Sequence, residues 1–305
     1  MSGHSQTHND HVSQIFYTGI KQTWTNDLVF TGGFRSPRYR PIPEGMIAGM
    51  CSDGIGTKVE IAERLDDYRC LGFDLVAMVC DDASAIGAKP WMMTNTLDVN
   101  PHPDMIPRVE ELVQGLANAA VEGGVPVVGG EYAQLGHRIE GYGYLSMIWN
   151  AALTWVAEPN KIINGSRVKA GDKIVSLYEP GCRSNGFTLI REILTNKCQM
   201  EKDAPDGEPW LQHLKTPSAI YTPALQEMLA DEDIEVSGMI HVTGGGLSGR
   251  LKSYLGAMNL GAHLDSPHTP GYVFQMFLEK GWVDIRTAYD TWCMGNGFLV
   301  LTPDA

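Results

Sequence analysis

The stretch SDGIGTK, residues 52–58, follows the apolar run at residues 46–50 and marks a corner between a strand and a helix. Its acid, Asp53, can bind a divalent cation. The groups that a phosphate needs, namely open backbone amides, a hydroxyl and a positive charge, come from Gly54, Gly56, Thr57 and Lys58. Taken alone, a glycine-rich acidic turn is more often only a turn. The segment also differs from the common phosphate loop, G-x-x-x-x-G-K-[ST].

Three further glycine-rich segments strengthen the reading of SDGIGTK as an anion site. They are VVGGEYAQL (residues 127–135), EPGCRSNGFTLIREIL (179–194) and HVTGGGLSGRL (241–251). Each follows an apolar, strand-like run, and the last two lead into amphipathic patterns. Backbone amides at such corners bind anions with help from the helix dipole. Several corners of this kind in one chain indicate a partner that is a phosphorylated small molecule.

Composition excludes several classes of partner. The 305 residues include 23 basic and 36 acidic side chains, a formal net charge of −13, and no basic stripe that nucleic acid would require. No apolar stretch reaches the roughly 18 residues of a membrane helix, and the polar start MSGHSQTHND is unlike a signal peptide. The six cysteines lack C-x-x-C spacing and read as reduced thiols of a cytoplasmic protein.

The pattern along the chain predicts an α+β fold in two domains. Residues 105–122 form a strongly amphipathic helix, residues 91–99 and 141–156 read as strands, and a boundary rich in charge, Pro and Gly lies at 158–171. We therefore expect a flexible tail over residues 1–18, a nucleotide-binding domain over 19–160 and a substrate domain over 161–305.

In this order and spacing, the segments resemble the AIR synthetase (phosphoribosylformylglycinamidine cyclo-ligase) family. The matching pieces are SDGIGTK, GFDLVAMVCDDASAIGAKP (residues 72–90), VVGGE, SNGFTLIREIL (184–194), IHVTGGGL (240–247) and, more weakly, CMGNGF (293–298). The superfamily includes selenophosphate synthetase and thiamine-monophosphate kinase. The resemblance implies a homodimer paired through the N-terminal sheets, with ATP and Mg²⁺ as cofactors. The formyl oxygen of formylglycinamidine ribonucleotide would be phosphorylated before ring closure.

The resemblance also assigns site residues. It implies that Asp53 and Asp82 bind Mg²⁺, with Asp81 and Glu131 as additional candidates, and that Lys58 contacts the ATP phosphates. Asp81 and Asp82 could instead be exposed acids on a helix, but their apolar neighbours favour a compensating cation. Glu131 could equally cap a turn.

The second domain is expected to bind the other substrate. Its candidate contacts for a ribose phosphate or a polyphosphate are Arg183, Ser184, Asn185, Gly186, Thr243, Gly244 and Gly245. His241 and Arg183 are the candidate catalytic side chains beside Lys58, although a histidine on a strand is more often structural.

The chain departs from the family at several positions. Arg183 replaces the usual His, and it cannot act as a neutral base. Asp81 replaces Asn, and Gln134 replaces a second Glu. The chain also ends soon after the MGNGF strand, so we expect a shortened second domain. Two alternatives stay open: a related small-molecule kinase or synthetase of the same superfamily, and a nucleotide-binding protein without turnover.

Overall fold

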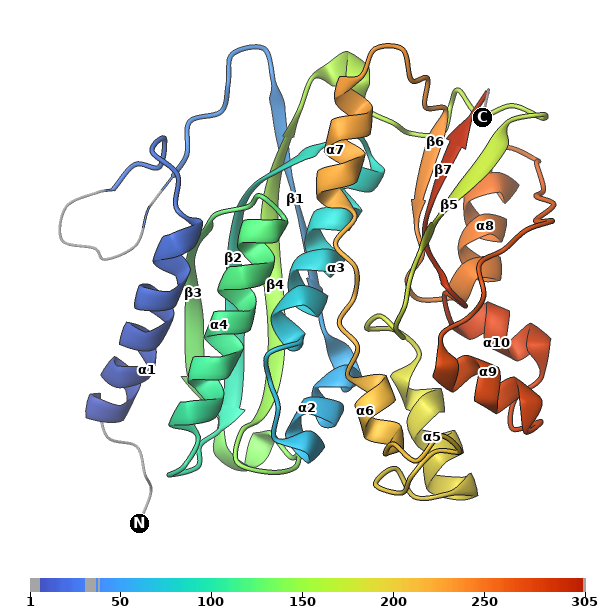
Figure 1. The fold of residues 1–305 in the computed structure, drawn as a ribbon. Coiled ribbons are helices and arrows are strands. Elements are labelled where there is room, and N and C mark those ends of the chain that lie inside the picture. Colours follow the sequence, from blue (N-terminus) through green and yellow to red (C-terminus); the bar gives the residue numbers. More distant parts are fainter. Residues whose placement is uncertain (1–5, 31–36, 38, 304–305) are drawn as a thin grey trace. The chain divides into compact units, whose positions relative to one another are not determined.

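The computed structural model describes residues 6–30, 37 and 39–303. The chain divides into two compact units, Met1–Ile162 and Ile163–Ala305, each with a sheet of its own (Figure 1). We call them unit 1 and unit 2. Strands and helices are mixed in both units, as the α+β prediction requires.

Unit 1 is built on a four-stranded sheet whose strands are ordered β1-β4-β2-β3. The strands are β1 (Ile47–Gly54), β2 (Lys89–Asn100), β3 (Val127–Gln134) and β4 (Ser146–Ala157). Strand β4 runs antiparallel to both β1 and β2, whereas β2 and β3 are parallel. The order places β1 and β3 at opposite edges of the sheet.

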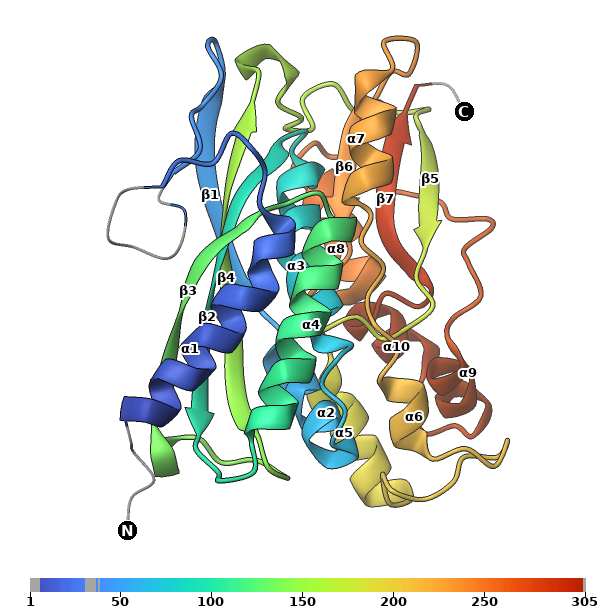
Figure 2. The same ribbon diagram turned by 60° about the vertical axis from the view of Figure 1, so that its left-hand side comes forward.

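Helices cover one face of this sheet. They are α1 (Gln6–Ile20), α3 (Leu71–Ala85) and α4 (Ile106–Glu122), and the short α2 (Val59–Leu65) follows β1. Figure 2 shows α1, α4 and α3 side by side against the strands. Helix α4 buries Val109, Leu112 and Leu116 at helical spacing, as the sequence pattern predicts. Helices α3 and α4 approach closely at Gly72, where an added Cβ would lie 2.2 Å from the backbone N of Leu116.

The other face of the sheet is open in the described chain. Along β2, Met93 and Leu97 are buried, while Thr94 and Thr96 between them are exposed. Met50 of β1 is 70% exposed on this side. The period-two alternation thus gives a helix-covered face and a free face with some apolar side chains.

The expected tail over residues 1–18 is wrong for its described part. Residues from Gln6 onward form helix α1, which packs on α4 and β3. Val12 and Ile20 are buried, and an added Cβ at Gly19 would collide with Val113 of α4. The helix forms because this apolar face is covered by tertiary contacts. Residues 1–5 lie outside the described residues.

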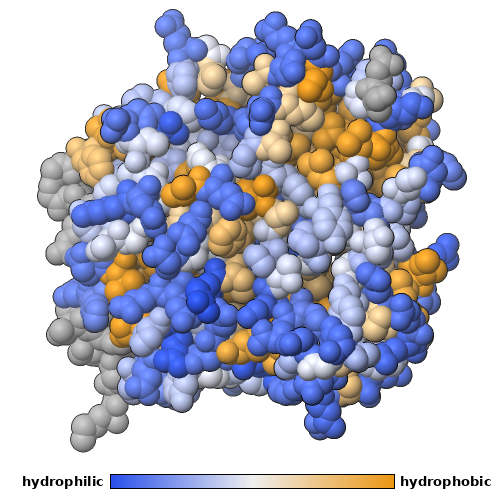
Figure 3. Space-filling model, viewed as in Figure 1, coloured by the Kyte–Doolittle hydropathy of each residue, from blue (hydrophilic) through white to orange (hydrophobic). Residues whose placement is uncertain are grey.

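Unit 2 contains a three-stranded antiparallel sheet in the order β5-β7-β6. Its elements are β5 (Lys173–Tyr178), α5 (Phe187–Lys197), α6 (Trp210–Leu214), α7 (Thr222–Ala230), β6 (Gly238–His241), α8 (Gly246–Gly256), α9 (Tyr272–Glu279), α10 (Ile285–Thr291) and β7 (Asn296–Thr302). Leu247, Leu251 and Leu255 of α8 pack on Ile240 and Leu299 of the sheet. Figure 3 shows mostly hydrophilic side chains on the face of Figure 1, with a larger hydrophobic patch at the upper right.

Candidate functional site

Two predicted metal ligands, Asp53 and Asp82, lie on the helix-covered side of the unit 1 sheet, near Cys51. Cys51 and Asp53 lie two positions apart on β1 and share its helix-covered face, since Cys51 Sγ donates a hydrogen bond to the Val79 carbonyl of α3 at 3.4 Å. Asp82 lies three positions beyond Val79, so it follows on the same side of α3. Burial raises the pKa of the Cys51 thiol to about 12, and the negative charges of Asp82 and then Asp53 add to the effect. The charges of both carboxylates therefore act on the same thiol, which puts Asp53 and Asp82 in one neighbourhood.

Asp81 takes a different direction from Asp82. It is fully buried in α3, whereas Asp82 is only half-buried. Consecutive helical positions point about 100° apart. Burial raises the pKa of the Cys80 thiol, and the charges of Asp81 and then of Cys51 raise it further. Asp81 as an additional Mg²⁺ ligand therefore stays a prediction, for a carboxylate that is buried where Asp82 is partly exposed.

The glycine turn that follows Asp53 exposes the backbone. An added Cβ at Gly54 would lie 3.1 Å from the Trp149 carbonyl, so only glycine fits this close approach without a shift. Gly56 has a φ of +64° and starts a 3₁₀ turn. Both Gly56 and Thr57 are exposed, so their amides and the hydroxyl are accessible to an anion.

Lys58 differs from the expectation. Its Nζ donates a hydrogen bond to Asp74 Oδ1 of α3 at 2.7 Å, and both side chains are 0% exposed. The Lys58 ammonium therefore has no exposed surface that a phosphate in solvent could contact. This corrects the expectation that Lys58 is available to a ligand, because the fold uses it in a buried ion pair that anchors the turn on α3.

Glu131 lies at the far edge of the sheet from Asp53. It is exposed on β3 and pairs in register with Thr96. Three strand spacings separate β3 from β1, about 14 Å at roughly 4.8 Å each. Glu131 instead lines a cavity of about 340 Å³ with Ser13 and Tyr17 of α1. The order of the strands therefore separates Glu131 from Asp53 within one chain. This corrects the expectation that Glu131 lies with the metal ligands.

In unit 2, two predicted glycine corners come together. Gly186 (φ +77°) precedes α5 and Gly245 (φ +91°) precedes α8. An added Cβ at Gly244 would lie 3.9 Å from Asn185 Nδ2, so the two corners touch. Ser184 Oγ and Asn185 Oδ1 are buried there without a hydrogen-bond partner among the described residues. Two positive helix ends and two unsatisfied oxygens suit a polar, anionic ligand group.

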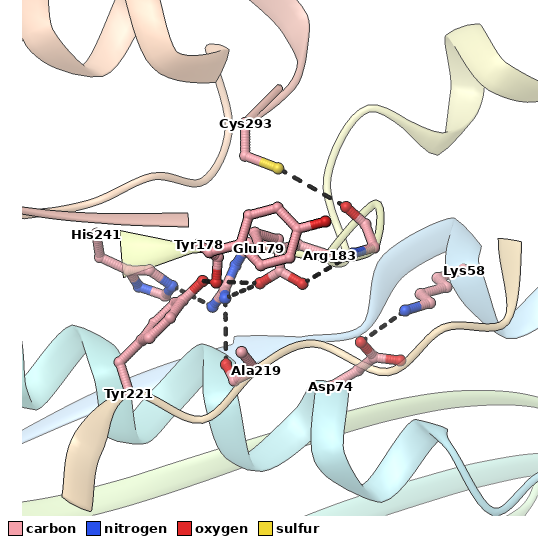
Figure 4. Close-up of polar contacts among 10 residues, drawn as sticks. Lys58, Asp74, Tyr178, Glu179, Arg183, Ala219, Tyr221, His241 and Cys293 are labelled. Atoms are coloured by element: carbon pink, nitrogen blue, oxygen red, sulfur yellow. Dashed lines mark hydrogen bonds and ion pairs between the residues drawn. The ribbon is translucent and has the colours of Figure 1, made fainter. Parts of the chain in front are cut away.

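Arg183 points into the interior of unit 2 (Figure 4). It has a φ of +51°, and its side chain is 1% exposed. Its Nη1 donates to Glu179 Oε2 at 2.7 Å and to the Ala219 carbonyl at 3.2 Å, and its Nη2 lies 2.6 Å from His241 Nε2. The Tyr221 hydroxyl also donates to Glu179 Oε2, at 3.1 Å. The expectation that Arg183 grips a phosphate is corrected, because Glu179 already neutralises its guanidinium.

Sequence reasoning missed the partners of these buried cations. The sequence pattern places Asp74 in a helix and Glu179 in a loop, and it predicts no role for either acid or for Glu63 of α2. Glu63 accepts hydrogen bonds from the amides of Tyr142 and Met147, both at 2.9 Å. Two features of the sequence indicate such partners. Asp74 is an acid within an apolar run, where a carboxylate needs a cation, and Glu179 stands four positions before Arg183.

Two cysteines, Cys182 and Cys293, lie in the loops of the unit 2 site. Cys182 and Cys293 are buried, and burial raises the pKa of the Cys293 thiol to about 12, followed by the charge of Glu179. Thiolates, not thiols, attack carbon or phosphorus. The burial of Cys293 therefore does not favour a nucleophilic role for its thiol.

No group of three or more His, Cys, Asp or Glu in the described ranges could hold a metal ion by itself. A pair of carboxylates is nevertheless a common protein contribution to Mg²⁺, which keeps water and substrate phosphates as its other ligands. Asp53 and Asp82 fit that donor set. In the same ranges, no helix is long and apolar enough to cross a membrane.

Comparisons with known proteins agree with the resemblance. Residues 39–148 match the family "AIR synthase related protein, N-terminal domain", and residues 169–305 match its C-terminal domain. The phosphoribosylformylglycinamidine cyclo-ligase of Methanothermobacter thermautotrophicus is 33% identical over 262 residues, 84% of this chain and 73% of that protein. The Pyrococcus horikoshii protein of the same name is 30% identical over 255 residues, covering 83% and 71%.

Solved structures show the same fold. Thiamine-monophosphate kinase from Stenotrophomonas maltophilia has a TM-score of 0.67 at 15% identity, covering 94% of this chain and 85% of its own. Hydrogenase maturation protein HypE in complex with ATP has a TM-score of 0.62 at 16% identity, covering 99% and 79%. At these identities the likeness concerns architecture.

Proposed function

Because the chain belongs to the AIR synthase related protein family in both of its units, we propose that it is an ATP-dependent cyclo-ligase of purine biosynthesis. It converts formylglycinamidine ribonucleotide to aminoimidazole ribonucleotide, with release of ADP and phosphate. The observation that carries the proposal is the placement of Asp53 on β1 and Asp82 on α3, both near enough to Cys51 for their charges to raise the pKa of its thiol, beside the exposed turn at Gly56 and Thr57. The names of the relatives supply the reaction.

The chemistry follows from a poor leaving group. An amide oxygen leaves with difficulty, so the γ-phosphoryl group of ATP is first transferred to the formyl oxygen and ADP is released. The amidine nitrogen then bonds to the formyl carbon, the C–O bond breaks, and phosphate and a proton are lost. The protein contributes mainly positioning and charge neutralisation.

The residues of unit 1 divide this task. Asp53 and Asp82 hold Mg²⁺, which neutralises phosphate charge when it is bound. The exposed amides of Gly56 and Thr57 face the polyphosphate, and the Thr57 hydroxyl adds a further hydrogen bond. Lys58 anchors the turn on α3 through its buried ion pair with Asp74.

Unit 2 supplies the site for the ribonucleotide. The ribose phosphate binds between the start of α5 and the start of α8, where Ser184 Oγ and Asn185 Oδ1 lack partners among the described residues. A protonated phosphate oxygen or a ribose hydroxyl can donate to Asn185 Oδ1, and Ser184 can donate to a phosphate oxygen.

The free face of the unit 1 sheet supports a homodimer. Met50 and Ile148 are exposed there, and an uncovered sheet face with apolar side chains gains stability by pairing with another. The six free thiols and a purine-biosynthetic role fit a reducing cytoplasm.

The test is a coupled measurement with the purified protein, ATP, Mg²⁺ and formylglycinamidine ribonucleotide. We expect ADP and the aminoimidazole product in equal amounts. Asp82→Asn should weaken Mg·ATP binding and reduce kcat at least about 100-fold, while Asp104→Asn, an exposed acid of the same unit, serves as the control. ADP without the aminoimidazole would indicate a kinase of the superfamily, and ATP binding without turnover would indicate a non-catalytic protein.

A further inference from the structure

Helices α8 and α10 of unit 2 pack against each other (Figure 1). The start of α8 meets the end of α10, because an added Cβ at Gly246 would lie 2.5 Å from the Tyr289 carbonyl oxygen and 2.7 Å from the Thr291 amide nitrogen. Beside this contact lies a cavity of about 670 Å³, a volume within the usual range of small-molecule sites. The cavity is lined by Ser248 and Lys252 of α8 and by Ile285, Arg286, Tyr289 and Asp290 of α10.

The cavity brings two cations together. Lys252 and Arg286 are both exposed, and neither has a hydrogen bond or an ion pair with a residue in the described part of the chain. Arg286 lies in the first turn of α10, where the helix dipole disfavours a positive charge, so the helix does not account for it. Asp284, the acid before this helix, accepts hydrogen bonds from the amide and the hydroxyl of Thr287. An anion bound at Lys252 and Arg286 would relieve the repulsion between them.

The other walls of the cavity suit the body of a small polar ligand. Ser248 stands four positions before Lys252, and Asp290 four positions after Arg286, so each lies about one helical turn, or about 5.4 Å, from its cation. A serine hydroxyl and a carboxylate both accept hydrogen bonds from hydroxyl groups. Apolar surface comes from Ile285, which is 66% exposed, and from the half-buried ring of Tyr289.

The cavity is separate from the glycine corner at the start of α8. Arg250 Nη2 donates a hydrogen bond to the Thr243 hydroxyl of that corner. Arg250 and Lys252 are two positions apart on α8, so their side chains point about 200° apart around the helix axis. Lys252 therefore faces away from the corner to which the proposed function assigns the ribonucleotide.

We propose that the cavity between α8 and α10 is a second binding site, for a sugar phosphate that is either free or part of a nucleoside monophosphate. The phosphate binds to Lys252 and Arg286, whose guanidinium can donate to two phosphate oxygens at once. The sugar hydroxyls, about one helical turn away, donate to Asp290 and Ser248. This site stands on the residues that line the cavity and is independent of the proposed reaction.

Methyl NMR reports on the cavity directly. In protein with ¹³C-labelled isoleucine methyl groups, ribose 5-phosphate should shift the Ile285 signal in a saturable way, with a Kd below about 1 mM. Ile55, which is buried beside the glycine turn of unit 1, reports binding in that unit separately. A higher Kd at Ile285, or no saturable shift, overturns the proposal.

Two further ligands identify the chemistry that is recognised. Adenosine monophosphate distinguishes the sources of the sugar phosphate: tighter binding than ribose 5-phosphate supports a nucleotide, and equal or weaker binding supports a free sugar phosphate. Inorganic phosphate is the control for charge alone. If it shifts the Ile285 signal with the same Kd as the two esters, the cavity holds an adventitious ion only and the proposal is overturned.

Charge variants test which side chains bind the phosphate. Lys252→Gln and Arg286→Gln should each weaken the binding of ribose 5-phosphate at least about fivefold, because each removes a charge-assisted hydrogen bond. Both side chains are exposed, so the melting temperature should stay at the wild-type value. Lys173→Gln is the matched control, since it removes an exposed cation of unit 2 that does not line the cavity. Equal affinities in all three variants would refute the assignment.

Asp290→Ala separates the recognition of the sugar from that of the phosphate. The variant loses a negative charge, so inorganic phosphate should bind more tightly to it than to the wild-type protein. It also loses an acceptor for the sugar hydroxyls, so the preference for ribose 5-phosphate over inorganic phosphate should fall at least about threefold. A preference that stays at the wild-type value shows that the sugar does not bind at Asp290, and the proposed mode of binding fails.

Discussion

The buried ion pair between Lys58 and Asp74 gives a prediction about stability. Both side chains are 0% exposed, and Nζ and Oδ1 are 2.7 Å apart. Lys58→Met removes the cation and leaves the carboxylate of Asp74 in an apolar surrounding. Breaking a buried pair in this way costs about 3–5 kcal/mol of the free energy of unfolding. For a chain of this size, the melting temperature should fall by roughly 10 °C.

The magnitude depends on burial, so an exposed pair is the matched control. Lys161 and Glu158 form a similar bridge at 3.0 Å, with side chains that are 59% and 46% exposed. Lys161→Met should change the free energy of unfolding by less than about 1 kcal/mol. Urea unfolding followed by circular dichroism measures both variants, with the wild-type m-value as a check that the unfolded states are comparable.

A double variant separates the pair from ligand binding. Lys58→Met/Asp74→Leu replaces two buried charges by apolar groups and should recover most of the lost stability, because such replacements are often neutral. Calorimetry should also show that it binds Mg·ATP with nearly wild-type affinity, because the buried Lys58 ammonium contacts Asp74 and not the ligand. A loss below 1 kcal/mol in Lys58→Met, or a much weaker ATP affinity in the folded double variant, would refute this reasoning.

Three further predictions concern burial and packing. Burial raises the pKa of Glu63 to about 7, so this carboxyl holds more protons in the folded state than in the unfolded one. The contribution of Glu63 to stability is therefore greatest below about pH 4.5 and falls as the pH rises to about 7, by roughly 3 kcal/mol. Urea unfolding from pH 4 to 8 should show this loss relative to Glu63→Gln, and a constant difference would contradict it. Cys293, with a thiol pKa of about 12, should resist iodoacetamide at pH 8 until the protein is unfolded, as mass spectrometry can check. Gly72→Ala should cost about 3 kcal/mol of unfolding free energy because its Cβ meets the α4 backbone, whereas Gly249→Ala, with nothing within 4 Å of the added Cβ, should cost nothing measurable.

The sequence by itself determined most of the regular elements of unit 1. The pattern at residues 105–122 predicts α4, which spans Ile106–Glu122, and the strand predicted at 91–99 is the centre of β2. These elements carry their own signal, because an amphipathic period repeats over many residues. Short elements lack it: α6 and α10 were not predicted, and β4 begins at Ser146 and not at residue 141.

The sequence also identified the segments that form the candidate sites. It selected Asp53, Asp82 and the glycine corners of unit 2 by residue type and by family resemblance. Strand–helix corners expose backbone amides wherever they occur, so this property can be inferred locally.

Only the tertiary structure decided which of these residues act together. The order of the strands puts Glu131 about three strand spacings from Asp53, and no local pattern encodes that order. Likewise, Lys58 and Arg183 were expected to face a ligand, but each is buried against an acid. The direction of a long cationic side chain depends on whether a distant carboxylate lies within reach, and folding alone brings the two together.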